Sequence, residues 1–324
     1  MISKIHGLSM SLTSYCSAAQ GRRTAIRRFV LPLYLMSVLV SCASAELDGS
    51  RAGSDAIELH TEVQGSGAPV LLIHGFGAST YTWRHLAPAL AQNFRVVAVD
   101  LKGFGQSPKP RDGRYSIYDQ VDLIEQLIYR LDLKNVIIVG HSYGGGVALL
   151  TSLRLIAEDP ARLSRLVLIG SAAYEQGTPA FIRLIQVPLL GDLAVRLIPE
   201  SWQAKWILRR AYYDDDKITE EIARSYSKPL RHAGAKYAVI RTARSLRQLD
   251  AAQIAEQFPS ISVPTFILWG RHDRIIPLEL GQRLAETIPN SSLRIIENCG
   301  HIPHEEHPEV TISLIREFLL EAGR

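Results

Sequence analysis

The stretch that decides the fold is Asn135-Val136-Ile137-Ile138-Val139-Gly140-His141-Ser142-Tyr143-Gly144, followed by Gly145-Gly146-Val147-Ala148-Leu149-Leu150. The apolar residues before Gly140 predict a buried strand, and the small apolar residues after Gly144 predict a tightly packed helix. Between them, Gly-x-Ser-x-Gly predicts a sharp turn with a strained backbone at Ser142, where Gly140 and Gly144 avoid steric clashes. A strand, a turn and a helix in this order form a nucleophile elbow, so Ser142 is the candidate nucleophile.

Strands and helices alternate on both sides of this turn. A half-buried edge strand is predicted at Ile57–Val63, where apolar and polar residues alternate. Helical periodicity follows from Ile117 to Leu131. The other apolar runs are continuous, as in strands buried on both faces of a parallel sheet: Pro69–Ile73, Phe94–Val99, Leu163–Ile169 and Thr265–Trp269. The alternation predicts an α/β fold with a mostly parallel, doubly wound sheet.

The alternation breaks over residues 175–255. No apolar strand run occurs there, whereas helical stripes, tryptophans and charges do. The segment has thirteen basic and nine acidic side chains, so it is also more basic than the rest of the chain. We therefore expect a helical cap inserted into a core made of residues 46–174 and 256–324. The candidates for the inner face of the cap are Phe181, Ile185, Leu189, Leu190, Trp202 and Trp206. The alternative is that most of these side chains only pack the cap on the core.

The first 45 residues resemble an export leader. Paired arginines precede the apolar segment Phe29–Val40, which is too short for a comfortable membrane span. Two processing sites fit: a bacterial lipobox, Leu39-Val40-Ser41-Cys42, which would make Cys42 the lipidated N-terminus, and Ala43-Ser44-Ala45 before Glu46. An uncleaved anchor and a translation start at Met10 are the alternatives. The expected location is the bacterial cell envelope, either lipid-anchored or periplasmic, or outside the cell.

Charge and cysteine content argue against a nucleic-acid-binding protein and against a fold stabilised by disulfide bonds. The net charge of +4 comes from the leader, because residues 46–324 have 31 basic and 32 acidic side chains. This balance excludes a nucleic-acid partner. Only Cys299 follows the leader, so the fold is held by its apolar core and not by an internal disulfide bond.

A serine nucleophile needs a base, which in turn needs an acid to orient it. Asp273 follows the strand Thr265–Trp269, and His301 follows the last strand, expected at Ser292–Glu297. Both can reach Ser142 because functional groups gather at the carboxyl ends of such strands. His272 is excluded because adjacent side chains diverge from each other. His304 and His307 are expected to decorate the start of the final helix, Pro308–Glu321.

The tetrahedral intermediate formed at such a serine needs two N–H donors. The backbone of Tyr143 offers one. The loop His74-Gly75-Phe76-Gly77 offers the other, with the Phe76 amide as the donor and with Gly75 and Gly77 permitting the unusual backbone. His74 is expected to be a structural hydrogen-bonding residue.

Together these motifs resemble those of cap-bearing α/β-hydrolases, a group with esterases, lipases, carbon–carbon bond hydrolases, epoxide hydrolases and haloalkane dehalogenases. The resemblance covers residues 57–320 and includes Asp100-Leu101-Lys102-Gly103-Phe104-Gly105-Gln106-Ser107, which is expected to be structural. The last two classes use an aspartate nucleophile, whereas Ser142 suits acyl chemistry. The resemblance implies the α/β-hydrolase fold and a catalytic triad of Ser142, His301 and Asp273, without a metal or cofactor.

The leader favours an exported serine hydrolase of small or medium acyl esters, since ring-cleavage hydrolases act on intracellular metabolites. The alternatives are a carbon–carbon bond hydrolase of ring-cleavage diketones, an acyltransferase, and a slow or non-catalytic ligand-binding protein on the same fold. The partners expected are a small-molecule acyl substrate and, through Cys42, a membrane. The sequence leaves the oligomeric state open.

Overall fold

The computed structural model describes residues 57–175 and 179–321, and the leader with Cys42 lies outside this range. Seven strands form one sheet in the order β1-β3-β2-β4-β5-β6-β7, in which β1 is antiparallel to β3 and every other pair is parallel. The strands are β1 Thr61–Gln64, β2 Pro69–Ile73, β3 Arg95–Val99, β4 Val136–His141, β5 Leu163–Ile169, β6 Thr265–Gly270 and β7 Ser291–Ile296. The predicted mostly parallel, doubly wound sheet is confirmed.

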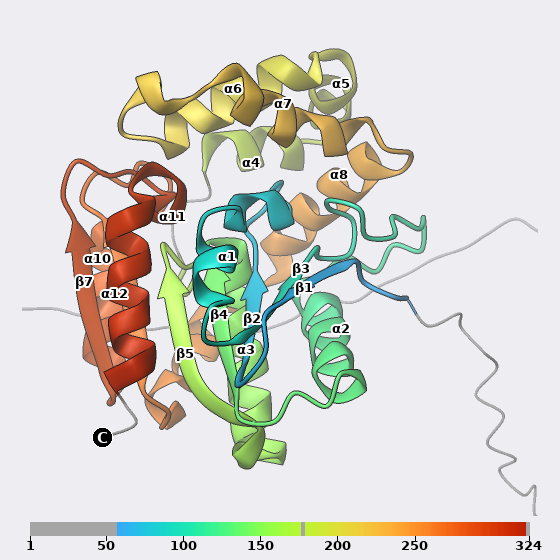
Figure 1. Ribbon diagram of the computed structural model, residues 1–324. Coiled ribbons are helices and arrows are strands. Elements are labelled where there is room, and N and C mark those ends of the chain that lie inside the picture. Colours follow the sequence, from blue (N-terminus) through green and yellow to red (C-terminus); the bar gives the residue numbers. More distant parts are fainter. Residues whose placement is uncertain (1–56, 176–178, 322–324) are drawn as a thin grey trace, which may run out of the picture. The chain divides into compact units, whose positions relative to one another are not determined.

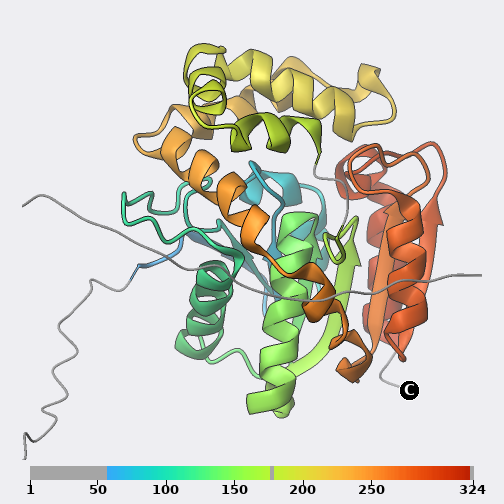
Figure 2. The same cartoon turned by 180° about the vertical axis from the view of Figure 1, so that it is seen from behind.

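Helices pack on both faces of this sheet (Figures 1 and 2). Leu71 and Ile73 face a core cluster shared with α2, α3 and α10, whereas Val70 and Leu72 face a second cluster shared with α1 and α12. Both faces of β2 are therefore buried, which explains its unbroken apolar sequence. These helices are α1 Leu86–Leu90, α2 Ile117–Arg130, α3 Tyr143–Glu158, α10 Leu278–Thr287 and α12 Pro308–Glu321.

Between β5 and β6, the described part of the chain contains helices and no strand. They are α4 Ala180–Gln186, α5 Leu190–Leu197, α6 Glu200–Ala211, α7 Glu220–Ser227, α8 Ala235–Ser245 and α9 Ala251–Ala255. Figures 1 and 2 show α4 to α7 beyond the carboxyl ends of the parallel strands. Thr219 caps α7, where its hydroxyl accepts a hydrogen bond from Ile222 N–H. Among the described residues, no helix combines the length and apolarity that a membrane crossing needs.

The ends of several elements differ from the sequence expectations. The connection between β2 and β3 has a 3₁₀ turn, Thr80–Trp83, followed by the short α1. Strand β1 spans only the second half of the expected Ile57–Val63. A short helix, α11 Pro303–Glu306, precedes α12 and was not expected. It follows His301 directly, so it bears on the site described next.

Candidate active site

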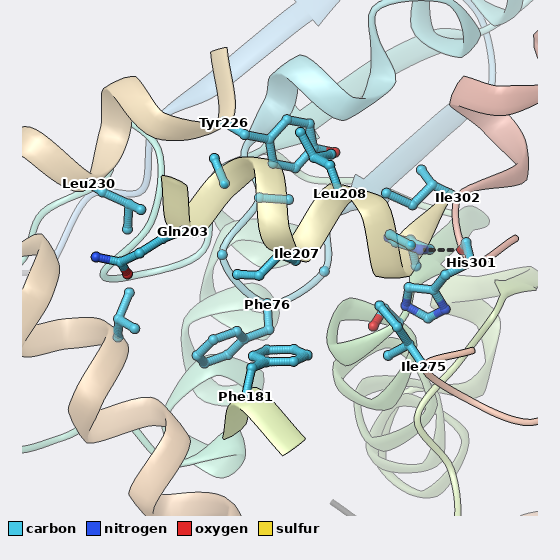
Figure 3. Close-up of a pocket in the computed structure, with 18 of the residues that line it drawn as sticks. Phe76, Phe181, Gln203, Ile207, Leu208, Tyr226, Leu230, Ile275, His301 and Ile302 are labelled. Atoms are coloured by element: carbon cyan, nitrogen blue, oxygen red, sulfur yellow. Dashed lines mark hydrogen bonds between the residues drawn. The ribbon is translucent and has the colours of Figure 1, made fainter. Parts of the chain in front are cut away.

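A small, mostly apolar cavity of about 90 Å³ lies between the carboxyl ends of the strands and the helices above them (Figure 3). Ser142, His301 and Phe76 line it from the core. Phe181 of α4 and Ile207 of α6 line it from the inserted helices. Phe76, Ser142 and Phe181 also border a second cavity, of about 290 Å³. The predicted nucleophile and base thus face the same enclosed space.

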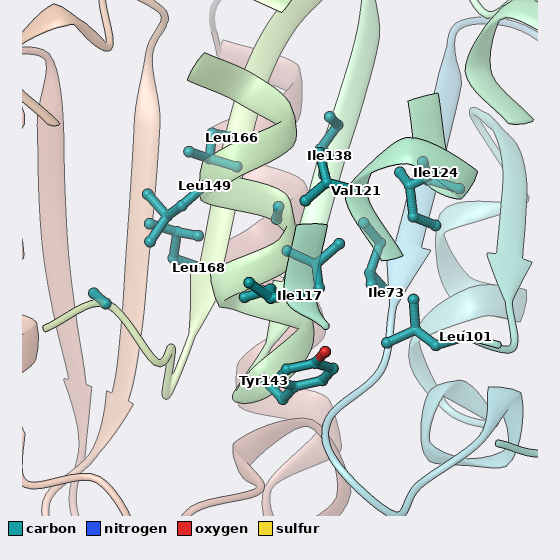
Figure 4. Packing of buried hydrophobic residues seen from close by; sticks show 14 of the residues in the cluster. Ile73, Leu101, Ile117, Val121, Ile124, Ile138, Tyr143, Leu149, Leu166 and Leu168 are labelled. Atoms are coloured by element: carbon teal, nitrogen blue, oxygen red, sulfur yellow. The ribbon is translucent and has the colours of Figure 1, made fainter. Parts of the chain in front are cut away.

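Ser142 joins β4 to α3 with φ 54° and ψ −122°, a conformation that costs a non-glycine residue about 1–3 kcal/mol. The residues two positions before and two positions after Ser142 must be glycine. A Cβ at Gly144 would lie 2.3 Å from the carbonyl oxygens of Ile73 and His74, and one at Gly140 would lie 2.6 Å from Gly144 O. The Tyr143 side chain packs into the buried core near Ile117 (Figure 4). The turn is therefore fixed from both sides, with Ser142 half-buried at its tip.

His301 is held by a buried carboxylate. Its Nδ1 lies 2.7 Å from Asp273 Oδ2, and both side chains are almost fully buried. Asp273 Oδ1 accepts hydrogen bonds of 2.8 Å from the N–H groups of Ile275 and Ile276. His141 Nε2 donates to His301 O at 2.9 Å. These contacts fix the ring of His301, and a proton held on Nδ1 leaves Nε2 available as an acceptor.

Two backbone N–H groups beside Ser142 are unused. Within the described chain, neither Phe76 N–H nor Tyr143 N–H has a hydrogen-bond acceptor. Gly75 comes so close to the elbow that a Cβ there would lie 3.0 Å from Ser142 Cβ, and Gly77 adopts φ +75°. The glycines thus bring the Phe76 loop against Ser142 and turn its backbone. Two free donors at this point can stabilise negative charge on a bound oxygen.

The residues around this loop are structural. His74 Nδ1–H donates to Gly75 O, and its Nε2 accepts from Leu101 N–H at 3.0 Å. The two carboxylate oxygens of Asp100 accept from Thr80 N–H and Gln106 N–H, each at 2.7 Å. These bonds tie the Phe76 loop to the segment Asp100–Ser107.

The expectation for the inner face of the inserted helices was partly wrong. Phe181 and Ile185 line the cavity, but Leu189, Leu190, Trp202 and Trp206 are exposed. The buried face of α5 has Gly191 and Val195 instead, and that of α6 has Ala204, Leu208 and Ala211. The buried face of α6 thus includes two alanines, whereas its two tryptophans are exposed. Lining residues that were not predicted include Gln203, Ile207, Tyr226 and Leu230.

His307 directly precedes α12, as expected, but His304 does not lie at the start of that helix. It belongs to α11, is buried, and stacks on Trp83 with 4.6 Å between ring centroids. The next residue, Glu305, is buried as well and accepts hydrogen bonds from Thr82, Arg84, Tyr212 and Tyr226. The spacing of apolar residues in the sequence does not indicate this cluster. A charged residue is buried where the fold supplies partners for it, and such partners leave no periodic pattern in the sequence.

Glu306 continues the same connection between the inserted helices and the His301 loop. Its Oε1 accepts from Tyr213 N–H and Asp214 N–H, and its Oε2 accepts from Gly300 N–H at 2.7 Å. His272 stacks on Tyr213. The end of α6 is thus bound directly to the loop that carries His301. No group of three metal-ligating side chains occurs among residues 57–175 and 179–321.

Three buried histidines predict a loss of stability in mild acid. Burial lowers the pKa of His74, and lowers that of His141 and His304 well below 6.5. The unfolded chain therefore binds more protons than the folded protein below about pH 6.5, and the free energy of unfolding falls as the pH decreases through that value. We expect a loss of up to about 1.4 kcal/mol per pH unit for each ring. Urea denaturation between pH 7 and pH 5.5 measures it.

One variant assigns this acid sensitivity. His304→Gln removes one buried ring and should flatten the dependence of the free energy of unfolding on pH. Equal slopes for the wild type and His304→Gln would contradict the assignment.

Comparison with known proteins gives a consistent result. The family model for the alpha/beta hydrolase fold matches residues 68–308. A 2-hydroxymuconate semialdehyde hydrolase of Pseudomonas sp. (strain CF600) is 31% identical over 266 residues, which cover 80% of this chain and 89% of that protein.

Two solved structures are similar over most of their length. One is a meta-cleavage product hydrolase from Pseudomonas fluorescens IP01, with 28% identity, a TM-score of 0.69, and coverage of 82% of this chain and 95% of that one. The other is a thermophilic esterase from Thermogutta terrifontis, with 28% identity, a TM-score of 0.70, and coverage of 82% and 94%.

Proposed function

Because this chain belongs to the α/β-hydrolase fold family, we propose that it is a serine hydrolase of carboxylic esters. The observation that carries the proposal is the buried His301–Asp273 pair, with 2.7 Å between Nδ1 and Oδ2, in which His301 lines the same cavity as Ser142. A histidine oriented by a carboxylate beside a serine is the arrangement that activates a hydroxyl nucleophile.

The proposed reaction has two halves. Ser142 Oγ attacks the ester carbonyl while His301 Nε2 takes its proton, and the Phe76 and Tyr143 N–H groups stabilise the oxyanion. Collapse of the tetrahedral intermediate breaks the bond to the alkoxy oxygen, which leaves as the alcohol with the proton from His301. Water then attacks the acyl-enzyme with His301 as the base, releasing the acid and restoring Ser142. Asp273 holds the ring in place and stabilises its charged form.

The shape of the site supports an ester with an apolar acyl group. The cavity shared by Ser142, Phe181, Ile207 and Leu230 has a mostly apolar wall. The second cavity, which also borders Ser142, can take the leaving group. Two spaces meeting at one nucleophile suit a substrate with a group on each side of the attacked carbonyl.

A second candidate is hydrolysis of a carbon–carbon bond in a ring-cleavage diketone. It rests on the relative named as a 2-hydroxymuconate semialdehyde hydrolase. Such a substrate has a carboxylate, and Arg247 is a cation on the wall of the second cavity. The same Ser142, His301 and Asp273 would serve this reaction. Collapse of the tetrahedral intermediate would break the carbon–carbon bond, and the fragment would leave as an enolate that takes up the proton from His301.

We expect one substrate panel to separate the two reactions. If the protein is an esterase, kcat/KM on p-nitrophenyl esters will vary strongly with acyl length, and Arg247→Gln will change these values by less than about twofold. If it cleaves diketones with a carboxylate, Arg247→Gln will raise KM about tenfold or more, since a hydrogen bond to a charged group contributes about 1.5–3 kcal/mol. Arg241→Gln is the matched control, because Arg241 is exposed on α8 and does not line this cavity. Steady-state kinetics on both substrate classes gives the answer, and activity on neither would contradict both.

We also propose that the protein is exported and processed at Cys42 or before Glu46. The support is the leader sequence alone. Mass spectrometry of the mature N-terminus distinguishes a lipidated Cys42, a free Glu46 and an intact Met1, of which the last would contradict processing.

A further inference from the structure

Exposed large apolar side chains are concentrated in one segment. Of the fifteen that occur among the described residues, nine lie between Leu184 and Trp206. The most exposed are Leu189 at 78%, Leu197 at 73% and Trp202 at 72%. We call the surface formed by Leu189, Leu193, Leu197, Trp202 and Trp206 the cap face. A large exposed apolar surface in a folded protein marks an interaction site.

The cap face spans α5 and α6, which follow each other directly in the chain. Leu193 and Leu197 are one turn apart on α5, and Trp202 and Trp206 are one turn apart on α6. Gln203 Nε2 donates to Val195 O and Ile198 O, which fixes the start of α6 against the end of α5. Both helices lie on the side of α4 that is away from the sheet (Figures 1 and 2).

The segment that carries the cap face has more basic than acidic side chains. Residues 180–211 have five basic and two acidic side chains. Both acids are already paired with cations of α8: Asp192 with Arg244 and Glu200 with Lys236. Arg183, Arg196 and Arg210 have no carboxylate partner within the described chain, and all three are exposed. The cap face is therefore apolar, and the segment that carries it has three exposed arginines without a carboxylate partner.

We propose that the cap face docks on the surface of an anionic phospholipid bilayer. Leucine and tryptophan enter the region between headgroups and acyl chains, and arginines around them bind anionic headgroups. Tryptophan is the side chain that prefers this interface most clearly. A protein partner of matching shape could also bury the leucines of the cap face. The unpaired arginines favour the bilayer, because its anionic headgroups are negatively charged.

Docking in this way would place the bilayer beside the candidate active site. Trp206 contacts Phe181 edge to face, with 6.2 Å between ring centroids, and Phe181 lines both cavities at Ser142. One aromatic ring thus separates the proposed membrane contact from the cavities.

The distribution of tryptophans provides a direct test. The chain has four: Trp202 and Trp206 on the cap face, and Trp83 and Trp269, which are fully buried in the core. The full chain is mixed with vesicles of phosphatidylglycerol and phosphatidylcholine that have brominated acyl chains, and tryptophan emission is recorded. We expect quenching relative to unbrominated vesicles, and its loss in Trp202→Phe/Trp206→Phe. The measurement reads the cap face itself, since the leader contains no tryptophan.

Substitutions of the leucines on the cap face provide a second test. Leu193→Asp/Leu197→Asp should lower vesicle binding or bromine quenching about tenfold or more, because it removes apolar contact and adds charge that the lipids repel. Val310→Asp, at an exposed apolar site on α12, is the matched control and should have no effect. Unquenched tryptophans in vesicle-bound protein would overturn the proposal. So would lipid-free dimers, seen by sedimentation, that Leu193→Asp/Leu197→Asp converts to monomers.

Discussion

Ser142→Ala is expected to reduce kcat for ester hydrolysis by about four to six orders of magnitude, as loss of the nucleophile does in other serine hydrolases. The substitution removes the Oγ that would form the acyl-enzyme, and His301 then has no hydroxyl to deprotonate. The Phe76 and Tyr143 N–H groups would remain, so a small residual rate above that of water is expected. The measurement is steady-state hydrolysis of a short-chain p-nitrophenyl ester, with covalent labelling by a fluorophosphonate probe.

Ser171→Ala is the matched control for this substitution. Ser171 follows β5, is fully buried, and its Oγ has no hydrogen-bond partner among the described residues. Its hydroxyl also lies near the elbow, because a Cβ at Gly145 would approach it to 2.0 Å. The variant should keep its labelling and its activity. Fluorophosphonate labelling that survives in folded Ser142→Ala would refute Ser142 as the nucleophile.

The sheet and the elbow could be predicted from the sequence because their signals are local. The apolar run Val136–Val139 lies in a strand buried on both faces, and contacts between neighbouring backbones require Gly140 and Gly144. Asp273 and His301 could be predicted for a related reason: each follows a strand whose carboxyl end lies at the same edge of the sheet.

The inserted helices were harder to predict because burial there depends on partners distant in the sequence. Large apolar residues such as Trp202 suggest an inner face, yet the buried face of α6 includes Ala204 and Ala211 instead. Glu305 presents the opposite case. It resembles a surface residue, but Arg84 and Tyr212, which lie 221 and 93 residues away in the chain, enclose it. No periodic pattern encodes such pairings.

Glu305→Ala is expected to lower the free energy of unfolding by about 3–5 kcal/mol, the usual cost of removing one partner of a buried ion pair. Arg84 Nη1 lies 2.7 Å from Glu305 Oε2, and Tyr212 OH donates to the same oxygen at 2.8 Å. Burial and the nearby Glu305 carboxylate raise the pKa of Tyr212 and Tyr226, so both hydroxyls remain protonated donors. Without the carboxylate, the guanidinium and both hydroxyls lose their acceptor. Urea denaturation at pH 7 measures the loss.

Glu297→Ala is the matched control for Glu305→Ala, because it also removes a carboxylate that is paired with an arginine. Glu297 accepts three hydrogen bonds from Arg271, of 2.7, 3.0 and 3.2 Å, but the pair is largely exposed and should contribute less than about 1 kcal/mol. Because Tyr212 follows α6 and Tyr226 lies on α7, Glu305→Ala should also loosen the helices over the cavity and raise KM more than it lowers kcat. A stability loss no greater than that of Glu297→Ala would mean that the buried cluster does not hold these helices to the His301 loop.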